Sequence, residues 1–230
     1  MNPYGYMGPG WKRQQVNTCG TIVIIVSQVF FVGGIYKMKN ELNPRILIFG
    51  AGVIGSIFAG KLANAGFNVT ILARNERFRE LVSKGLILEH SLTGERLEIK
   101  IPVINKLEKE DNYDFIIVAV QNTQINEVLP TLADNNSKNI VFVINNPSGY
   151  EKWVDSVGRD RVLIGFPSAG GVRENGEVYY FIGTGITKVF QATTFGEISG
   201  KITARLKLLI YYGKAYLRCK RGNGGIGSSI

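Results

Sequence analysis

Short runs of consecutive apolar residues alternate with segments of helical periodicity along most of the chain. The apolar runs are typical of strands in a parallel sheet covered on both faces: RILIF (45–49), NVTILA (68–73), YDFIIVAV (113–120) and NIVFVINN (139–146). Between them, SIFAGKLANAG (56–66), ERFRELVSKG (76–85) and TQINEVLPTLA (123–133) predict helices. The alternation predicts a Rossmann-like, doubly wound α/β domain over residues 41–200.

Two later segments depart from this rhythm. In residues 86–104, apolar residues alternate with charged ones from Leu97 to Ile101, and Thr93-Gly94 favours a turn, so we expect an inserted β-hairpin. Residues 161–183 predict short strands around a turn, and we expect a helix to begin near Gly200.

Residues 1–40 are expected to form an extension outside the fold. Residues 14–36 carry no charge, but Ser27 and Gln28 interrupt their apolar part, and a membrane-spanning helix needs about 20 mostly apolar residues. Three interpretations stay open. We favour a disordered extension or a start-site artefact ahead of Met38; the others are a membrane anchor through residues 14–36 and a cleaved signal peptide.

The formal net charge of +9 comes from the two ends of the chain. Of the 27 basic residues, four lie in residues 1–40 and seven in residues 201–230, and neither segment contains an acid. The other 16 stand against 18 acidic residues in residues 41–200. A nucleic-acid partner requires a basic face on the folded body, so we expect none.

Cysteine and histidine are too few for a metal site. Cys19 and Cys219 lie in the two ends without CxxC spacing, and His90 is the only histidine. We therefore expect no metal, no Ser-His-Asp triad, and a reducing, cytoplasmic compartment. His90 is expected to be an ordinary surface residue of the hairpin.

A glycine motif lies between the first strand and the first helix of the predicted domain. It consists of Gly50, Ala51, Gly52, Val53, Ile54 and Gly55. In such a turn the first glycine allows the sharp bend, the second lets a pyrophosphate approach, and the third lets helix and strand pack closely. Because strand, turn, helix and second strand follow in the required order, the motif predicts a dinucleotide site.

The residue at the end of the second strand favours NADPH as the cofactor. Units that bind NAD carry an acid about 20 residues after the motif, where it holds the ribose 2′-hydroxyl. This chain has Arg74 there, and a guanidinium suits the 2′-phosphate of NADP. Arg77 and Arg79 are candidates to share this contact, whereas Glu76 leaves NAD open. The competing interpretation is that Arg74 is a solvated surface residue.

Taken together, these features resemble the ketopantoate reductase (2-dehydropantoate 2-reductase) family over about residues 44–200. The resemblance rests on ILIFGAGVIGSIFAGKLANAG, VTILAR followed by GLILEH, DFIIVAVQ, VINNPSGYE and RVLIGFPSAGG. It implies an NADPH-dependent oxidoreductase that converts ketopantoate to pantoate, on the way to pantothenate and coenzyme A. It further implies that the glycine motif, Arg74, Gln121 and Asn146 bind the cofactor, with Asn146 near the nicotinamide and substrate. Taken alone, Asn146 is explained equally well as a capping residue.

The chain also departs from the family pattern. Gln121 stands where the family usually has a lysine, and Asn145-Asn146-Pro147 replaces Gln-Asn-Gly. The family's helical C-terminal domain, which carries the general-acid lysine, is expected to be largely missing, so the catalytic residue is unknown. We expect residues 201–230 to form the start of a linker helix and an atypical tail, which a frameshift or truncation would explain.

Two hypotheses for the function follow. The first is an NADPH-dependent reductase of a small 2-ketoacid, whose identity Gln121 leaves open, with this chain inactive by itself. The second is a non-catalytic dinucleotide-binding module or pseudoenzyme. A homodimer stays open as the assembly.

Overall fold

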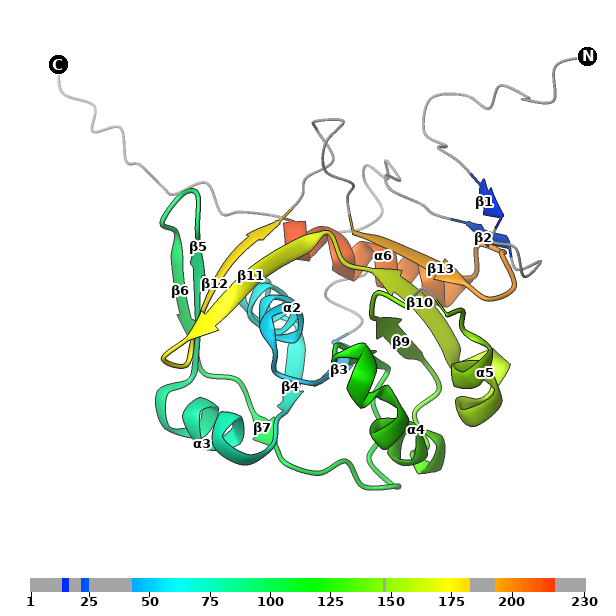
Figure 1. Ribbon diagram of the computed structural model, residues 1–230, viewed down its shortest axis with the longest axis horizontal. Coiled ribbons are helices and arrows are strands. Elements are labelled where there is room, and N and C mark those ends of the chain that lie inside the picture. The colour runs from blue at the N-terminus through cyan, green and yellow to red at the C-terminus, as the bar shows by residue number, and fades with distance from the viewer. Residues whose placement is uncertain (1–13, 17–21, 25–42, 147, 183–192, 218–230) are drawn as a thin grey trace, which may run out of the picture.

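A seven-stranded sheet lies at the centre of the computed structural model, which describes residues 14–16, 22–24, 43–146, 148–182 and 193–217 (Figure 1). Its strand order is β13-β10-β9-β8-β3-β4-β7. The strands are β3 (Arg45–Phe49), β4 (Asn68–Leu72), β7 (Val103–Ile104), β8 (Phe115–Val118), β9 (Ile140–Val143), β10 (Val162–Phe166) and β13 (Thr194–Glu197). All neighbours are parallel except β13, which pairs antiparallel with β10. Without β13 this is the order of a doubly wound dinucleotide-binding sheet, which confirms the predicted fold class.

Helices cover both faces of this sheet (Figure 1). The helical segments are α2 (Val53–Asn64), α3 (Asn75–Lys84), α4 (Ile125–Asp134), α5 (Glu151–Val157) and α6 (Ala204–Leu217), with the short 3-10 turns η1 (Asn122–Gln124) and η2 (Arg159–Arg161). Successive residues of β3 point to opposite faces. Ile46 and Ile48 pack with α2 and α6, while Leu47 and Phe49 pack with α4 and α5. This two-sided burial explains why the strand is apolar without interruption.

The predicted hairpin is part of a separate four-stranded sheet. β5 (Leu86–His90) and β6 (Arg96–Ile99) pair antiparallel as expected, and His90 Nδ1 accepts the N–H groups of Leu92 and Thr93 in the turn, each at 3.3 Å. A second hairpin, β11 (Ala169–Glu174) and β12 (Glu177–Ile182), completes the order β11-β12-β5-β6 through a parallel β12–β5 pair. The local alternation of residues predicts each strand but not its distant partner, so this joining of two hairpins was not predicted.

Helix α2 lies between the two sheets, and its residues 55–62 are all buried. A helix that is buried on all sides is typical of such a position. Gly60 allows the close approach, since a Cβ there would lie 2.5 Å from Leu88 Cδ1 of β5. The buried ammonium of Lys61 lies 5.3 Å from the centre of the Tyr180 ring, a cation–π arrangement.

An ion pair joins β13 to α6. Arg205 Nε and Nη2 donate to the two carboxylate oxygens of Glu197 at 2.8 and 2.6 Å, and the Thr203 hydroxyl donates to the same carboxylate. Burial acts to raise the pKa of Glu197, but these hydrogen bonds more than offset it, and the pKa lies below its ordinary value. The helix expected near Gly200 begins at Ala204, and the antiparallel strand before it, β13, was not predicted.

Only part of the N-terminal segment is described. Residues 14–16 and 22–24 pair antiparallel as β1 (Gln14–Val16) and β2 (Ile22–Ile24). The rest of the 14–36 run, both cysteines and the tail from residue 218 lie outside the described residues. No helix in the described part of the chain has the length and hydropathy needed to cross a membrane.

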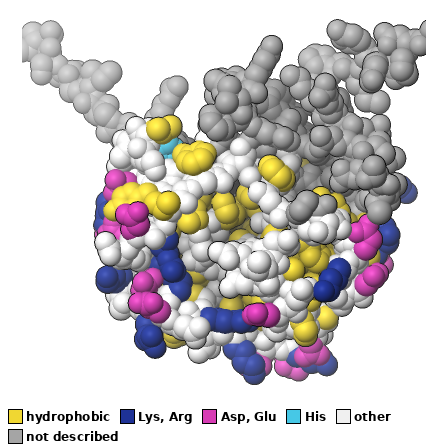
Figure 2. All heavy atoms as spheres, viewed as in Figure 1, with side chains coloured by type: hydrophobic (Ala, Val, Ile, Leu, Met, Phe, Trp, Pro, Cys, Tyr) yellow, Lys and Arg dark blue, Asp and Glu magenta, His cyan; other side chains and the backbone are white. Residues whose placement is uncertain are grey.

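Charges of both signs are mixed on the surface. On the face shown in Figure 2, Lys and Arg side chains of the described residues lie among Asp and Glu side chains, with hydrophobic side chains between them. The described residues therefore form no continuous basic surface on this face.

Candidate functional site

A cavity of about 480 Å³ lies beyond the carboxyl ends of β3, β4 and β8. The ends of these strands and the segments directly after them contribute residues 49–53, 72–74 and 119–121 to its lining. The 3-10 turn η1 contributes Gln124, and α4 contributes Glu127 and Val128. Two arginines distant in sequence, Arg77 and Arg173, complete it. The chain passes from β3 to β4 on one side and later returns to β8 on the other, so the cavity lies at the point where strand order reverses. This is where open α/β sheets bind their ligands.

Three glycines shape the turn between β3 and α2, each for a different steric reason. Gly50 has φ +108°, and a Cβ there would lie 2.8 Å from Ala119 O. A Cβ on Gly55 would collide with the carbonyl of Gly50. A Cβ on Gly52 would meet nothing within 4 Å, so the backbone faces open space at this position. This open approach, directly before the first N–H groups of α2, fits the pyrophosphate of a dinucleotide.

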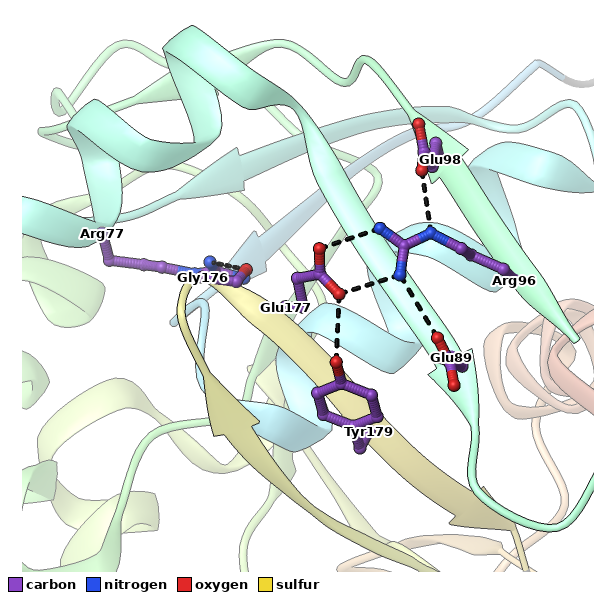
Figure 3. Close-up of polar contacts among 7 residues, drawn as sticks. All are labelled: Arg77, Glu89, Arg96, Glu98, Gly176, Glu177 and Tyr179. Carbon is purple, nitrogen blue, oxygen red and sulfur yellow. Dashed lines mark hydrogen bonds and ion pairs between the residues drawn. The ribbon is translucent and has the colours of Figure 1, made fainter. Parts of the chain in front are cut away.

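The glycine turn is held from behind by the buried guanidinium of Arg77. Its Nε donates to Ala51 O at 3.1 Å and its Nη2 to Ser56 Oγ at 3.2 Å. Its Nη1 donates to Glu80 Oε2 at 3.0 Å and to Gly176 O at 2.8 Å, the latter shown in Figure 3. Four of the five N–H groups of this guanidinium are therefore committed to the protein. Arg77 supports the turn, and has little capacity left to share a phosphate as the sequence had suggested.

Burial is the main influence on the Arg77 guanidinium. Burial lowers its pKa, and the hydrogen bond to Glu80 acts in the opposite direction. Arginine remains protonated in proteins even so, so the chain keeps a positive charge beneath the turn. Only a group with this many donors in one plane reaches Ala51, Ser56 and Gly176 together.

A second arginine fixes the strand that follows Gly176 (Figure 3). Arg96 of β6 makes a bidentate pair with Glu177, both contacts at 2.8 Å. The same guanidinium bonds Glu98 at 2.8 Å and Glu89 at 3.2 Å, and hydrogen bonds to these acids raise its pKa. Glu177 begins β12, directly after the carbonyl that Arg77 uses. The Arg96 cluster thus ties three strands together next to the anchor of the glycine turn.

The structure brings most of the predicted cofactor residues to one cavity. Gly50, Ala51, Gly52, Val53, Arg74 and Gln121 all line it. Arg74 directly precedes α3 and is exposed, whereas the neighbouring Arg79 does not reach the lining. Ile54 and Gly55 lie behind the turn, in the first turn of α2.

Asn146 is not brought to this cavity. Its Nδ2 donates to Gly149 O at 2.5 Å, and its Oδ1 accepts the N–H of Ser148 at 3.0 Å. These contacts are those of a residue that stabilises its own loop. They form a turn ahead of α5, whose N-cap is Tyr150, so Asn146 does not cap that helix in the way the sequence suggested.

The polar lining residues that were not predicted from the sequence are Gln124, Glu127 and Arg173. The first two lie on the segment after β8 and follow from the rule that ligands bind at strand ends. Arg173 comes from the four-stranded sheet, and no local pattern connects it to the glycine turn.

Comparison with known proteins gives consistent results. A family model described as ketopantoate reductase PanE/ApbA matches residues 46–194. A 2-dehydropantoate 2-reductase of Listeria innocua is 26% identical over 170 residues, which cover 73% of this chain and 56% of the relative. The chain spans about half the length of the curated relatives it matches.

Solved structures show the same fold. The crystal structure of 2-dehydropantoate 2-reductase from Methylococcus capsulatus has a TM-score of 0.62 at 20% identity, and the match covers 74% of this chain and 54% of that one. A D-mandelate dehydrogenase solved with NADH and anilino(oxo)acetate has a TM-score of 0.52 at 26% identity, covering 60% of this chain and 45% of that one. Relatives of this fold thus include an enzyme solved with NADH.

The steric roles of the glycines give a stability test. Gly55→Ala should lower the free energy of unfolding by roughly 1–3 kcal/mol or more, because the new methyl group collides with the Gly50 carbonyl. Gly52→Ala should leave stability nearly unchanged, since its methyl group enters open space. Thermal denaturation followed by circular dichroism compares the two. Equal destabilisation by both substitutions would contradict this description of the turn.

Proposed function

Because the chain belongs to the ketopantoate reductase family, we propose that its cavity binds NADPH and serves a reductase of small 2-ketoacids. Arg74 is the observation that carries this proposal: an arginine lies at the end of β4, in the lining shared with the glycine turn. An acid at that place would favour the ribose diol of NAD, whereas a guanidinium favours the 2′-phosphate of NADP. The proposed compartment is the cytoplasm, and ketopantoate is the first substrate to test.

In this proposal, different residues of the chain bind different parts of the dinucleotide. The open backbone at Gly52 and the free N–H groups at the start of α2 bind the pyrophosphate. Arg74 binds the 2′-phosphate. Bound NADPH supplies the hydride for reduction of a ketone. The chain's own contribution is to hold and orient the cofactor, and Arg77 contributes by keeping the turn in place.

A second candidate function is a dinucleotide-binding module without catalysis. The neutral side chain of Gln121 lines the cavity where the family resemblance implies a lysine. Among the residues that the structure describes, the lining contains neither lysine nor histidine, so none of them places a proton donor of those types beside the proposed cofactor. General acid catalysis typically raises the rate by 10²–10⁴. A site without a general acid can therefore bind the cofactor and still catalyse the reduction very slowly.

Cofactor selectivity tests the proposal. Arg74→Asp should weaken NADPH by roughly tenfold or more, because a charge-assisted phosphate contact is worth about 1.5–3 kcal/mol. NADH should be far less affected. Titration by cofactor fluorescence gives both dissociation constants, and Gln124→Asn is a control that keeps the charge of the cavity. Equal affinities for NADPH and NADH in the unaltered protein would show that Arg74 is an ordinary surface residue.

Turnover separates the two candidate functions. We expect this 230-residue chain to bind NADPH but to reduce ketopantoate little or not at all, since the described residues of its cavity include no lysine or histidine as proton donor. The fall in NADPH absorbance would be followed with ketopantoate and several other 2-ketoacids. Rapid turnover of any of them would exclude the non-catalytic module and would require a proton donor elsewhere in the chain.

A further inference from the structure

Arg173 approaches the cavity from the four-stranded sheet. In the β11–β12 ladder Arg173 pairs with Val178, and Val178 is fully buried on the face that packs toward α2. Paired residues share a face of the sheet, so Arg173 points to the same side as that core residue. Arg173 lies near the C-terminal end of β11, and its side chain is part of the cavity lining.

Three arginines gather on one side of the glycine turn. Arg74 directly precedes α3, Arg77 lies in its first turn, and both line the cavity together with Arg173. Arg173 is close enough that its charge contributes to lowering the pKa of Arg77. Glu80 pairs with Arg77 at 3.0 Å. Within the described part of the chain, Arg74 and Arg173 form no ion pair.

Unpaired like charges beside one cavity favour an anion there. Guanidiniums that line the same cavity repel each other, and a bound anion removes that cost. The pyrophosphate is already matched by the glycine turn and the start of α2. The remaining anion of NADPH is its 2′-phosphate, a monoester whose charge at neutral pH is about −1.5 to −2. One arginine neutralises only part of that charge.

We propose that Arg173 is a second ligand of the 2′-phosphate of NADPH, acting together with Arg74. The four-stranded sheet then takes part in choosing between NADPH and NADH. The contact between Arg77 and Gly176, in the turn that joins β11 to β12, holds this sheet against the glycine turn. This inference rests on the proposed function and adds a specificity residue to the same site.

The test compares NADPH and NADH affinities of the unaltered chain, Arg173→Gln and Arg173→Lys. Arg173→Gln should weaken NADPH about five- to tenfold, the effect of losing one charge-assisted contact at an exposed site. Its affinity for NADH should change less than about twofold, because screening weakens the effect of a removed charge on the more distant pyrophosphate. Arg173→Lys should recover part of the NADPH affinity, since it keeps the charge without the planar fork.

Arg79→Gln is the matched control, because it removes an exposed arginine of α3 that does not line the cavity. It should change neither affinity. Melting temperatures of all variants confirm that they are folded, and repeating the titrations at higher salt should reduce the NADPH effect of Arg173→Gln.

The outcomes separate this inference from the proposed function. If Arg173→Gln weakens NADPH and NADH equally, or weakens neither, the inference is wrong. If it weakens neither while Arg74→Asp selectively weakens NADPH, only the role of Arg173 is overturned. If the unaltered chain does not prefer NADPH over NADH, the proposed function and this inference fail together.

Discussion

The buried guanidinium of Arg77 is the constraint on which the site depends. A charge removed from water must be matched by hydrogen bonds, or it destabilises the fold by several kcal/mol. Here the partners come from separate parts of the chain: Ala51 and Ser56 at the glycine turn, Glu80 on α3, and Gly176 between β11 and β12. Satisfying one side chain therefore fixes the position of the glycine turn relative to the four-stranded sheet.

The central sheet and the core of the site could be predicted from the sequence. Strands buried on both faces are continuously apolar, and helices between them carry their own periodicity, so RILIF and its neighbours indicate a parallel sheet. The glycine motif carries steric information that is local, because Gly50 and Gly55 collide with nearby backbone if they gain a side chain. Arg74 could be found because its distance from the motif is set by one helix and one strand.

The other features of the fold and of the site depend on contacts between distant segments, which local sequence patterns do not indicate. The pairing of β12 with β5 joins two hairpins that were each predictable only as hairpins. Arg77 resembles any helical surface arginine until Gly176 is placed beside it. Asn146 fits a motif by position, but its amide is used within its own loop. The role of a residue that fits a motif by spacing thus depends on the direction of its side chain and on the pairing of distant segments, which the spacing does not specify.

The affinity of an Arg77→Lys variant for both cofactors tests most directly whether this guanidinium builds the site. Lysine keeps the charge, but its three donors radiate from one nitrogen and cannot span Ala51, Ser56 and Gly176 together. In the proposed site the turn binds the pyrophosphate, which NADPH and NADH share. Titration of the folded variant well below its melting temperature should therefore show both cofactors weakened alike, by about tenfold. Unchanged affinity for both, in a variant whose melting temperature has fallen, would contradict the claim that Arg77 positions the turn for binding.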